Sequence, residues 1–511
     1  MSLARIDFTH PSNPTTVLEP RLWITEGRSL LRLAAPIMLI ALVNMGMSVT
    51  DTAMVSVLFG ADALAAVAVG SDFYSIVFYL GAGILGGLAP FYTAATVRSD
   101  PAERARLLRI GWVMVGLVAA LTVPLVWSSP DWLATLGLDA GLLEQGRGYT
   151  SAMALTLVPM LGVMLYRTIL TAAEKPKVFL KVTIAMLPLN AVGNYVLMTG
   201  VGPIPAFGPT GAGISTLLVA SASLAILVVV ARRSSGNSSA APSGASVDWR
   251  GIVPVLRVGL PIGIATVAEV GVFLGATIYA ATLGAADVAA HTLTLRTAGV
   301  AYAVPMALLQ ASMVRMARAE TLGDPRTGRA VVTGSLVLSL AFGAVIFLLL
   351  AVGAAPLADA FFDDSAAGLA AAGLAAGLLV LLGLLEFIIG PGSAATGLLR
   401  GRRDTRAPMI YILVGHWAVG APLGLYLCEA QGLGITGVWI GLGAGTLLTT
   451  LLTLKRLFMC AWGSDGWYRS KFSDARFGSR PITCRTLGVA GTLRLRPGER
   501  QLQDLTASQR C

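Results

Sequence analysis

Charged side chains are scarce in this sequence. Only 13% of its 511 residues are Asp, Glu, Lys or Arg, whereas a soluble domain carries about 25%. Hydrophobic residues make up 55% of the chain and gather in long runs. The scarcity of charge excludes an ordinary soluble domain and predicts an all-α membrane protein that crosses the bilayer many times.

Cysteine pairs and catalytic motifs are also lacking. The four cysteines form no C-x-x-C pair, so neither a disulfide framework nor a zinc site is expected. No Walker A, H-E-x-x-H or G-x-S-x-G motif is present. A G-x-G-x-x-G match starts at Gly81 inside an apolar run, and we interpret it as close helix packing. We therefore expect that the protein is not an enzyme and has no cofactor.

Twelve apolar runs are long enough to cross a membrane, since a spanning helix needs about 20 mostly apolar residues. We predict spans at residues 31–57, 63–95, 107–128, 147–172, 178–200, 211–231, 252–283, 287–314, 330–352, 367–399, 407–428 and 434–458.

Basic residues fall in alternate loops between these runs. One set of loops carries residues such as Arg98, Lys175 and Arg402, whereas Arg147 is the only basic residue of the opposite loops. The positive-inside rule places the basic loops and both termini in the cytoplasm. We predict a multi-pass protein of the plasma (inner) membrane. The net charge of +10 then reflects topology, and we expect no nucleic-acid partner.

The spans and the polar stretches divide the chain into five segments. Residues 1–30 form a cytoplasmic N-terminal segment, 31–231 a first six-helix lobe and 251–458 a second six-helix lobe. Residues 232–250 are rich in Ser, Gly and Ala and are predicted to be a cytoplasmic linker. Residues 459–511 are polar and basic, and we predict a mostly disordered cytoplasmic tail.

The two predicted lobes are copies of one repeat. A shift of 225 positions aligns Pro36 with Pro261 and Asn44 with Glu269, without a gap. Because each repeat holds an even number of spans, the copies run parallel through the membrane. Parallel six-span halves are typical of transporters that work by alternating access.

Few ionisable side chains lie inside the predicted spans. Such groups usually face a cavity or pair with one another, and they mark ion or substrate paths. Burial disfavours a charged carboxylate, so an acid in a span can hold a proton near neutral pH. The candidates are Asp51, Asp72, Glu269, Arg296 and Glu386.

Asp51 is the candidate with the most polar surroundings. Asn190 and Asn194 are four residues apart in the fifth span and therefore share one helix face. With Asp51 they would suit a Na⁺ site or a hydrogen-bonded proton site. The alternatives are interhelical hydrogen bonds of the two amides and a structural Asp51 satisfied by the neighbouring Ser48 and Thr52.

Arg296 is the only base deep in a predicted span. It is either a structural cation paired with Asp72, Glu269 or Glu386, or a substrate contact. Glu269 has no base within one helical turn, which favours a proton or cation role, and Glu386 is similar.

Two histidines also lie in the spans. We expect His291, close to a helix start, to have a capping or interfacial role, and His416, beside Trp417, to be a satisfied core residue.

Several segments, in order, resemble the multidrug and toxic compound extrusion (MATE) family, in particular its NorM-like branch. They include VTDTAMVSVLFGADALAAV, RTILTAAEKPK before PLNAVGNYVL, GLPIGIATVAEV, and GLLRGRRDTRAPM before GHWAVGAPLGLYL. The resemblance covers about residues 30 to 458. It implies a V-shaped bundle of two six-helix lobes that exports organic molecules in exchange for H⁺ or Na⁺.

The resemblance also assigns roles to residues. The coupling-ion acid of the first span matches Asp51, and the fifth-span amide pair matches Asn190 and Asn194. The seventh-span glutamate of the branch matches Glu269. Two positions depart from the pattern, since Ile389 replaces the usual tenth-span aspartate and Arg296 stands where an amide is usual.

Glu386 lies one turn before Ile389 and is a candidate replacement for the missing aspartate. Arg296 could neutralise Glu269 or Glu386, or favour less cationic substrates. The sequence thus predicts a multidrug efflux antiporter, a monomer in the lipid bilayer with small organic substrates and H⁺ or Na⁺ as the coupling ion. The alternative is a flippase or exporter of a lipid-linked or amphipathic precursor.

Overall fold

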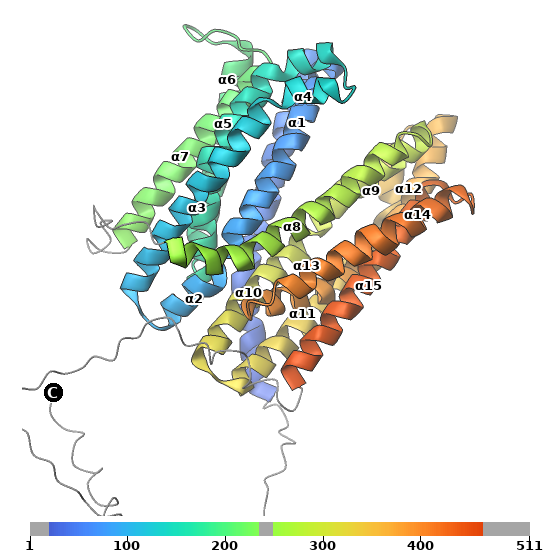
Figure 1. Cartoon of the computed structure of the whole chain (residues 1–511). Coiled ribbons are helices and arrows are strands. Elements are labelled where there is room, and N and C mark those ends of the chain that lie inside the picture. The colour runs from blue at the N-terminus through green and yellow to red at the C-terminus, as the bar shows by residue number, and fades with distance from the viewer. Residues whose placement is uncertain (1–19, 235–248, 463–511) are drawn as a thin grey trace, which may run out of the picture.

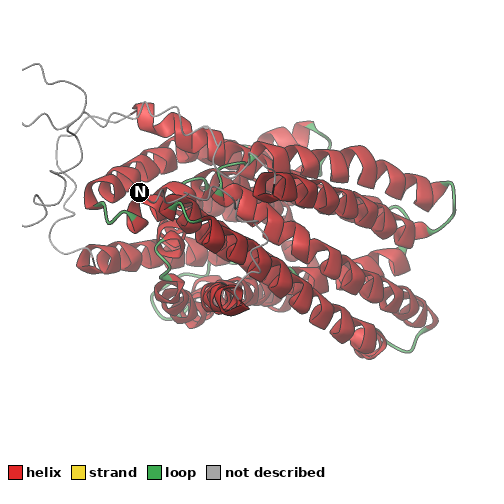
Figure 2. Ribbon diagram, turned by 90° about the horizontal axis from the view of Figure 1, so that it is seen from below, coloured by secondary structure: helices red, strands yellow, loops and turns green. Residues whose placement is uncertain are grey.

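The computed structural model describes residues 20–234 and 249–462. These residues form helices joined by short loops, apart from one isolated bridge between Val201 and Ile204 (Figure 2). Parts of three predicted segments lie outside the described residues. They are residues 1–19 of the N-terminal segment, 235–248 of the linker and 463–511 of the tail. The helices of the first half are α1 (Pro20–Gly86), α2 (Ala89–Val97), α3 (Pro101–Trp127), α4 (Ser129–Thr135), α5 (Ala140–Ala172), α6 (Pro176–Thr199) and α7 (Thr210–Ser234).

The second half repeats this arrangement with more breaks. Its helices are α8 (Trp249–Ala280), α9 (Ala285–Ala301), α10 (Ala303–Leu322), α11 (Pro325–Phe361), α12 (Ala366–Gly401), α13 (Arg406–Ile412), the π-helical segment η2 (Leu413–Gly420), α14 (Ala421–Glu429) and α15 (Gly434–Trp462).

The helices form a V with two arms that diverge toward the top of Figure 1. One arm contains α3, α5, α6 and α7 with the upper part of α1, and the other contains α9 and α11–α15. Each arm has its own apolar core. Leu157, Leu161 and Leu165 of α5 are fully buried in the first, as are Leu378 and Leu379 of α12 in the second. The predicted fold class, an all-α membrane bundle with a V shape, is confirmed.

The predicted number of twelve spans agrees with the structure. Eleven helical runs of the described chain are long and apolar enough to cross a membrane, and the first of them, Leu22–Val97, contains two predicted spans. The chain passes from one to the other at Gly60, where φ is 83°. This left-handed backbone favours glycine. The repeat has Gly284, with φ 147°, before α9, so both hairpins turn at a glycine.

Glycines also let the two halves touch closely. A Cβ atom on Gly83 of α1 would lie 2.4 Å from the Cα of Gly263 in α8. A Cβ on Gly259 would lie 2.1 Å from the carbonyl oxygen of Ile84. The interpretation of the glycine-rich run at Gly81 as close helix packing is therefore confirmed. The crossing of α1 and α8 joins the two arms.

The N-terminal part of α1 packs on the second arm. Leu30, Leu33 and Ile37 form a buried cluster with Leu308 and Val314 of α10. The first helix therefore bridges both halves of the V at its narrow end.

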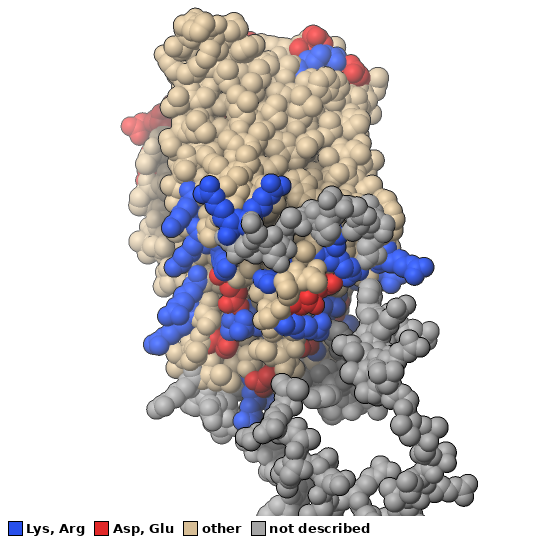
Figure 3. Space-filling view, turned by 90° about the vertical axis from the view of Figure 1, so that its left-hand side faces the viewer, with Lys and Arg blue, Asp and Glu red and all other residues tan. Residues whose placement is uncertain are grey.

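The two ends of the molecule differ in charge. On the face seen in Figure 3, Lys and Arg side chains gather over the lower half, and the broad band above them carries almost no charge. This lower end is the narrow end of the V in Figure 1, and it carries α2.

Candidate functional site

The site in the first arm is built from two helices. Asp51 lies on α1, inside the first predicted span, and Asn190 and Asn194 lie on α6. The Nδ2 of Asn194 donates a hydrogen bond to Oδ1 of Asp51, and Asn190 neighbours the same carboxylate. The structure thus brings together the three residues predicted for a coupling-ion site.

Both amides are almost completely buried, Asn190 at 1% exposure and Asn194 at 0%. Three of their polar atoms have no hydrogen-bond partner: Nδ2 and Oδ1 of Asn190 and Oδ1 of Asn194. A buried polar atom without a partner is costly. Two free carbonyl oxygens beside a carboxylate are the donor set that Na⁺ takes, and a protonated carboxyl could donate to one of them. The residues present therefore fit either coupling ion.

The alternative structural interpretation of Asp51 does not match these contacts. The hydroxyl of Thr52 donates to the backbone oxygen of Ser48, 2.9 Å away, rather than to the carboxylate. The partner of Asp51 comes from α6, 143 residues away, so the interhelical hydrogen bond considered as the alternative for the two amides is present for Asn194. Within the described part of the chain, no cluster of three or more His, Cys, Asp or Glu side chains could hold a metal ion.

The second arm carries a different set of acids. Glu269 on α8 accepts a hydrogen bond of 3.2 Å from the hydroxyl of Tyr302, which stands at the break between α9 and α10. Glu386 on α12 is 2% exposed, and its Oε2 has no hydrogen-bond partner. The charge of Glu269 acts on Glu386, so the two predicted acids are neighbours. Tyr302 is a site residue that the sequence did not single out.

Arg296 does not neutralise these acids. It is exposed on α9, and no ion pair among the described residues joins it to Glu269, Glu386 or Asp72. Its charge does act on Asp72, which is also exposed, on the second span of α1. The arginine whose charge acts on Glu269 is Arg400, at the end of α12.

The two membrane histidines are both core residues. His291 is fully buried, and its Nδ1 accepts a hydrogen bond of 3.2 Å from Trp439 Nε1 while Nε2 lies 3.0 Å from Thr277 Oγ1. The expected capping or interfacial role of His291 is wrong. His416 is buried, with its ring nitrogens on the Ile412 carbonyl and the Thr446 hydroxyl, as predicted.

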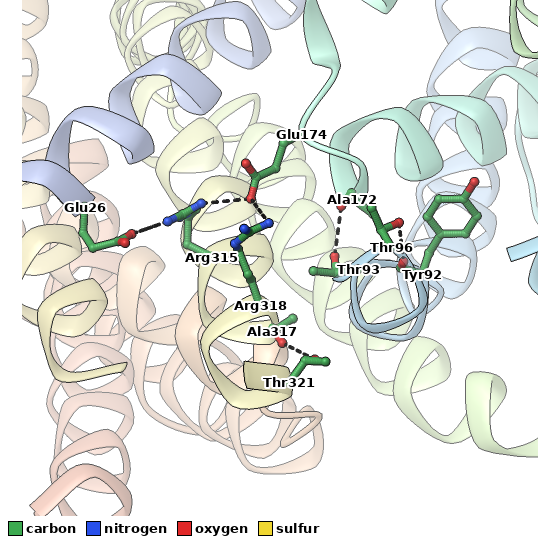
Figure 4. A network of polar contacts seen from close by, with 10 residues as sticks. All are labelled: Glu26, Tyr92, Thr93, Thr96, Ala172, Glu174, Arg315, Ala317, Arg318 and Thr321. Carbon is green, nitrogen blue, oxygen red and sulfur yellow. Dashed lines mark hydrogen bonds and ion pairs between the residues drawn. The ribbon is translucent and has the colours of Figure 1, made fainter. Parts of the chain in front are cut away.

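A charged network ties the two halves together at the narrow end of the V (Figure 4). Arg315 on α10 donates from Nε to Glu26 on α1 at 3.0 Å and from Nη1 to Glu174, in the loop after α5, at 2.9 Å. Arg318 lies 3.8 Å from the same oxygen of Glu174. One arginine of the second half therefore holds two carboxylates of the first.

An apolar cluster backs this network. Ala89 of α2 and Ala172 of α5 form a buried cluster with Met313 of α10. The hydroxyl of Thr93 also donates to the carbonyl of Ala172 at 3.3 Å. The narrow end is thus closed by ion pairs and by packed side chains.

This closure could not be predicted from the sequence. Glu26 and Arg315 are separated by 289 positions, and basic residues in this region fit the topology rule equally well. The unusual backbone of Glu174, with φ 57°, is visible only in the structure.

Known proteins resemble this chain over most of its length. The MatE family model matches residues 36–196 and 261–426. The probable multidrug resistance protein NorM of Bradyrhizobium diazoefficiens is 30% identical over 460 residues, which cover 88% of this chain and 97% of that protein.

Solved structures share the fold. A variant of the Vibrio cholerae MATE transporter VcmN has a TM-score of 0.77 at 16% identity, covering 88% of this chain and 100% of that one. An outward-facing multidrug resistance MATE transporter has the same TM-score of 0.77 at 16% identity, covering 86% of this chain and 97% of that one. With its two matched repeats and its V-shaped pair of helical arms, the chain belongs to the multidrug and toxic compound extrusion (MATE) family.

Proposed function

We propose that this protein is a secondary active multidrug efflux transporter. It exports amphipathic organic compounds in exchange for H⁺ or Na⁺. The observation that carries the proposal is the half-buried carboxylate of Asp51 beside two buried amide side chains with unpaired oxygens. The names of the NorM relatives support the multidrug role. Acids inside membrane spans are usually retained for ion or substrate transfer.

The orientation follows from charge. The narrow end of the V carries most of the Lys and Arg side chains seen in Figure 3, and the positive-inside rule assigns such an end to the cytoplasm. The transporter then lies in the plasma (inner) membrane as a monomer, with both termini in the cytoplasm. Its five segments are a cytoplasmic N-terminal segment (1–30), two lobes (31–231 and 251–458), a linker (232–250) and a tail (459–511).

Alternating access is supported by the closure of the narrow end. Arg315, Glu26 and Glu174 hold the two halves together there, while the arms diverge at the other end. In the proposed cycle this is the outward-facing state. Opening toward the cytoplasm requires the ion pairs of Arg315 to break and the cluster around Met313 to separate.

Coupling follows if the ion and the drug favour different states. An ion bound at Asp51, Asn190 and Asn194 would stabilise one arrangement of α1 and α6, and a bound drug would stabilise another. Each then promotes release of the other. Glu269 and Glu386 are proposed as a second protonation or substrate site, and Asp72 and Arg296 as substrate contacts.

Drug accumulation in cells tests the proposal. The wild-type protein and Asp51→Asn are expressed at equal levels in a strain that lacks its own drug pumps, and ethidium accumulation is measured. We expect low accumulation with the wild type and accumulation equal to the empty vector with the variant. Equal, low accumulation in both strains would refute the role of Asp51, and no reduction by the wild type would refute efflux.

A further inference from the structure

A cavity of about 510 Å³ opens at the narrow end of the V, away from the Asp51 site. It lies between α8 and the loop that joins α12 to α13. Its walls are formed by Arg257, Val258, Arg403, Asp404, Thr405 and Arg406. Three of the six lining residues are arginines, and they come from two separate parts of the chain.

Asp404 is the single acid among the six lining residues. Asp404 forms an ion pair with Arg456 of α15, with 3.0 Å between its Oδ2 and the arginine Nε. Burial and the neighbouring positive charge of Arg98 lower the pKa of the Arg403 guanidinium. The positive charges of Arg403 and Arg98 repel each other, and an anion bound in the cavity would offset this repulsion.

Arg403 is held in a defined position. Its guanidinium carbon lies 4.2 Å from the centre of the Phe91 ring of α2, a cation–π geometry. Its backbone has φ 63°, a left-handed conformation that costs a non-glycine residue free energy. The turn is fixed by hydrogen bonds of 2.9 Å from Arg403 N to Arg400 O and from Asp404 N to Leu399 O.

Exposed apolar side chains flank the cavity. Val253, Leu260 and Ile264 of α8 are exposed, and their spacing places them on the same helix face as Arg257. On the packed neighbours α13 and η2, Ile410 and Val414 are also exposed. A basic cavity thus adjoins an exposed apolar surface on helices long and apolar enough to cross a membrane, and such a surface suits contact with acyl chains.

We propose that this cavity binds the phosphate of an anionic phospholipid from the leaflet at the narrow end of the V. Arg257, Arg403 and Arg406 contact the phosphate oxygens, because planar guanidinium groups donate paired hydrogen bonds to phosphate. One acyl chain lies along Leu260 and Ile264. Basic pockets at the ends of membrane helices are typical sites for such headgroups.

Quenching of tryptophan fluorescence by brominated lipids tests the site. The full-length protein in neutral detergent is titrated with brominated phosphatidylglycerol and with brominated phosphatidylcholine of the same chains. Trp249, 59% exposed at the start of α8, and Trp417, which donates to Ala268 of α8, are reporters on the neighbouring helices. We expect the wild type to bind phosphatidylglycerol about tenfold more tightly than phosphatidylcholine.

The double variant Arg257→Ala/Arg406→Ala should lose most of this preference. Both side chains are exposed, so their removal leaves the packing of the helices unchanged. The matched control, Arg233→Ala/Arg326→Ala, removes two exposed arginines outside the cavity and should keep the preference.

Three results would overturn the proposal. They are equal binding of the two lipids by the wild type, an equal loss of preference in the control, and displacement of phosphatidylglycerol by inorganic phosphate at millimolar concentration. The last result would identify a soluble phosphate as the ligand.

Discussion

Asp51 is not required by the helical scaffold. Its counterpart in the second repeat is Ala276, which packs in the apolar core of the second arm. A charged side chain in the middle of a span costs roughly 2.5–3.5 kcal/mol even on insertion scales. A repeat that folds with alanine at this position therefore has no structural reason to carry an acid, which favours a functional one.

We predict that Asp51→Asn abolishes ion-coupled transport and leaves the protein folded. The side-chain amide oxygen of the variant can still accept the hydrogen bond from Asn194. The variant lacks the carboxylate that binds H⁺ or Na⁺. Transport of ethidium into everted vesicles should fall at least about tenfold, as expected for loss of an essential group. The control is Asp62→Asn, an exposed acid outside the site. Equal losses in both variants would contradict a specific role of Asp51.

Asn190 separates a structural role from an ion-binding role. Both polar atoms of its side chain are buried without a partner, which costs about 1–3 kcal/mol for such a group. We predict that Asn190→Leu, of similar volume, melts at the same temperature or higher, and yet loses coupled transport. A thermal unfolding curve and a transport assay on the same preparation test this. A lower melting temperature with intact transport would show a purely structural amide.

For individual side chains, the sequence predicted some contacts and missed others. The spacing of Asn190 and Asn194 places them on one helix face, and the structure brings that face to Asp51. The partner of His291, Trp439, lies 148 positions away, so the start of a helix gave a misleading local signal. Tyr302 was missed because an aromatic residue in a span has no polar signature of its own.

The helices meet through glycine at the crossing of α1 and α8. We predict that Gly259→Ala lowers stability, because its Cβ would overlap the Ile84 carbonyl at 2.1 Å. Overpacking of this kind costs about 1–3 kcal/mol. Gly275, on the same helix, has no atom within 4 Å of an added Cβ. Gly275→Ala should therefore leave the melting temperature unchanged. Similar melting temperatures for both variants would contradict the close crossing.

Hydrophobic length predicted the spans but not their breaks. The predicted second span ran to residue 95, whereas α1 ends at Gly86 and α2 starts at Ala89. The predicted eighth span is divided at Tyr302, and the eleventh contains the π-helical η2. These breaks depend on packing between helices, which apolar composition along one run does not record.

The whole molecule is held in one state by contacts between its halves. We predict that Arg315→Ala favours the state open at the narrow end, because Glu26 and Glu174 lose their shared partner. A cysteine at Met313, in a background without other cysteines, would report this through its labelling rate with a maleimide on the purified protein in detergent. The rate should rise about tenfold, as for a shift of about 1.4 kcal/mol.

The matched control is Arg326→Ala, an exposed arginine at the same end. If its labelling rate rises as much as that of Arg315→Ala, the ion pairs do not control the closure. The sequence did not predict these long-range ion pairs, because membrane topology already explains basic residues in a cytoplasmic loop.

Transport by purified protein in liposomes tests whether inward flow of an ion through Asp51 drives export. Ethidium transport is measured under a proton gradient alone, a sodium gradient alone and no gradient, for the wild type and Asp51→Asn. We expect that at least one gradient drives transport by the wild type and that neither drives transport by the variant. Gradient-driven transport by Asp51→Asn at the wild-type rate would contradict it.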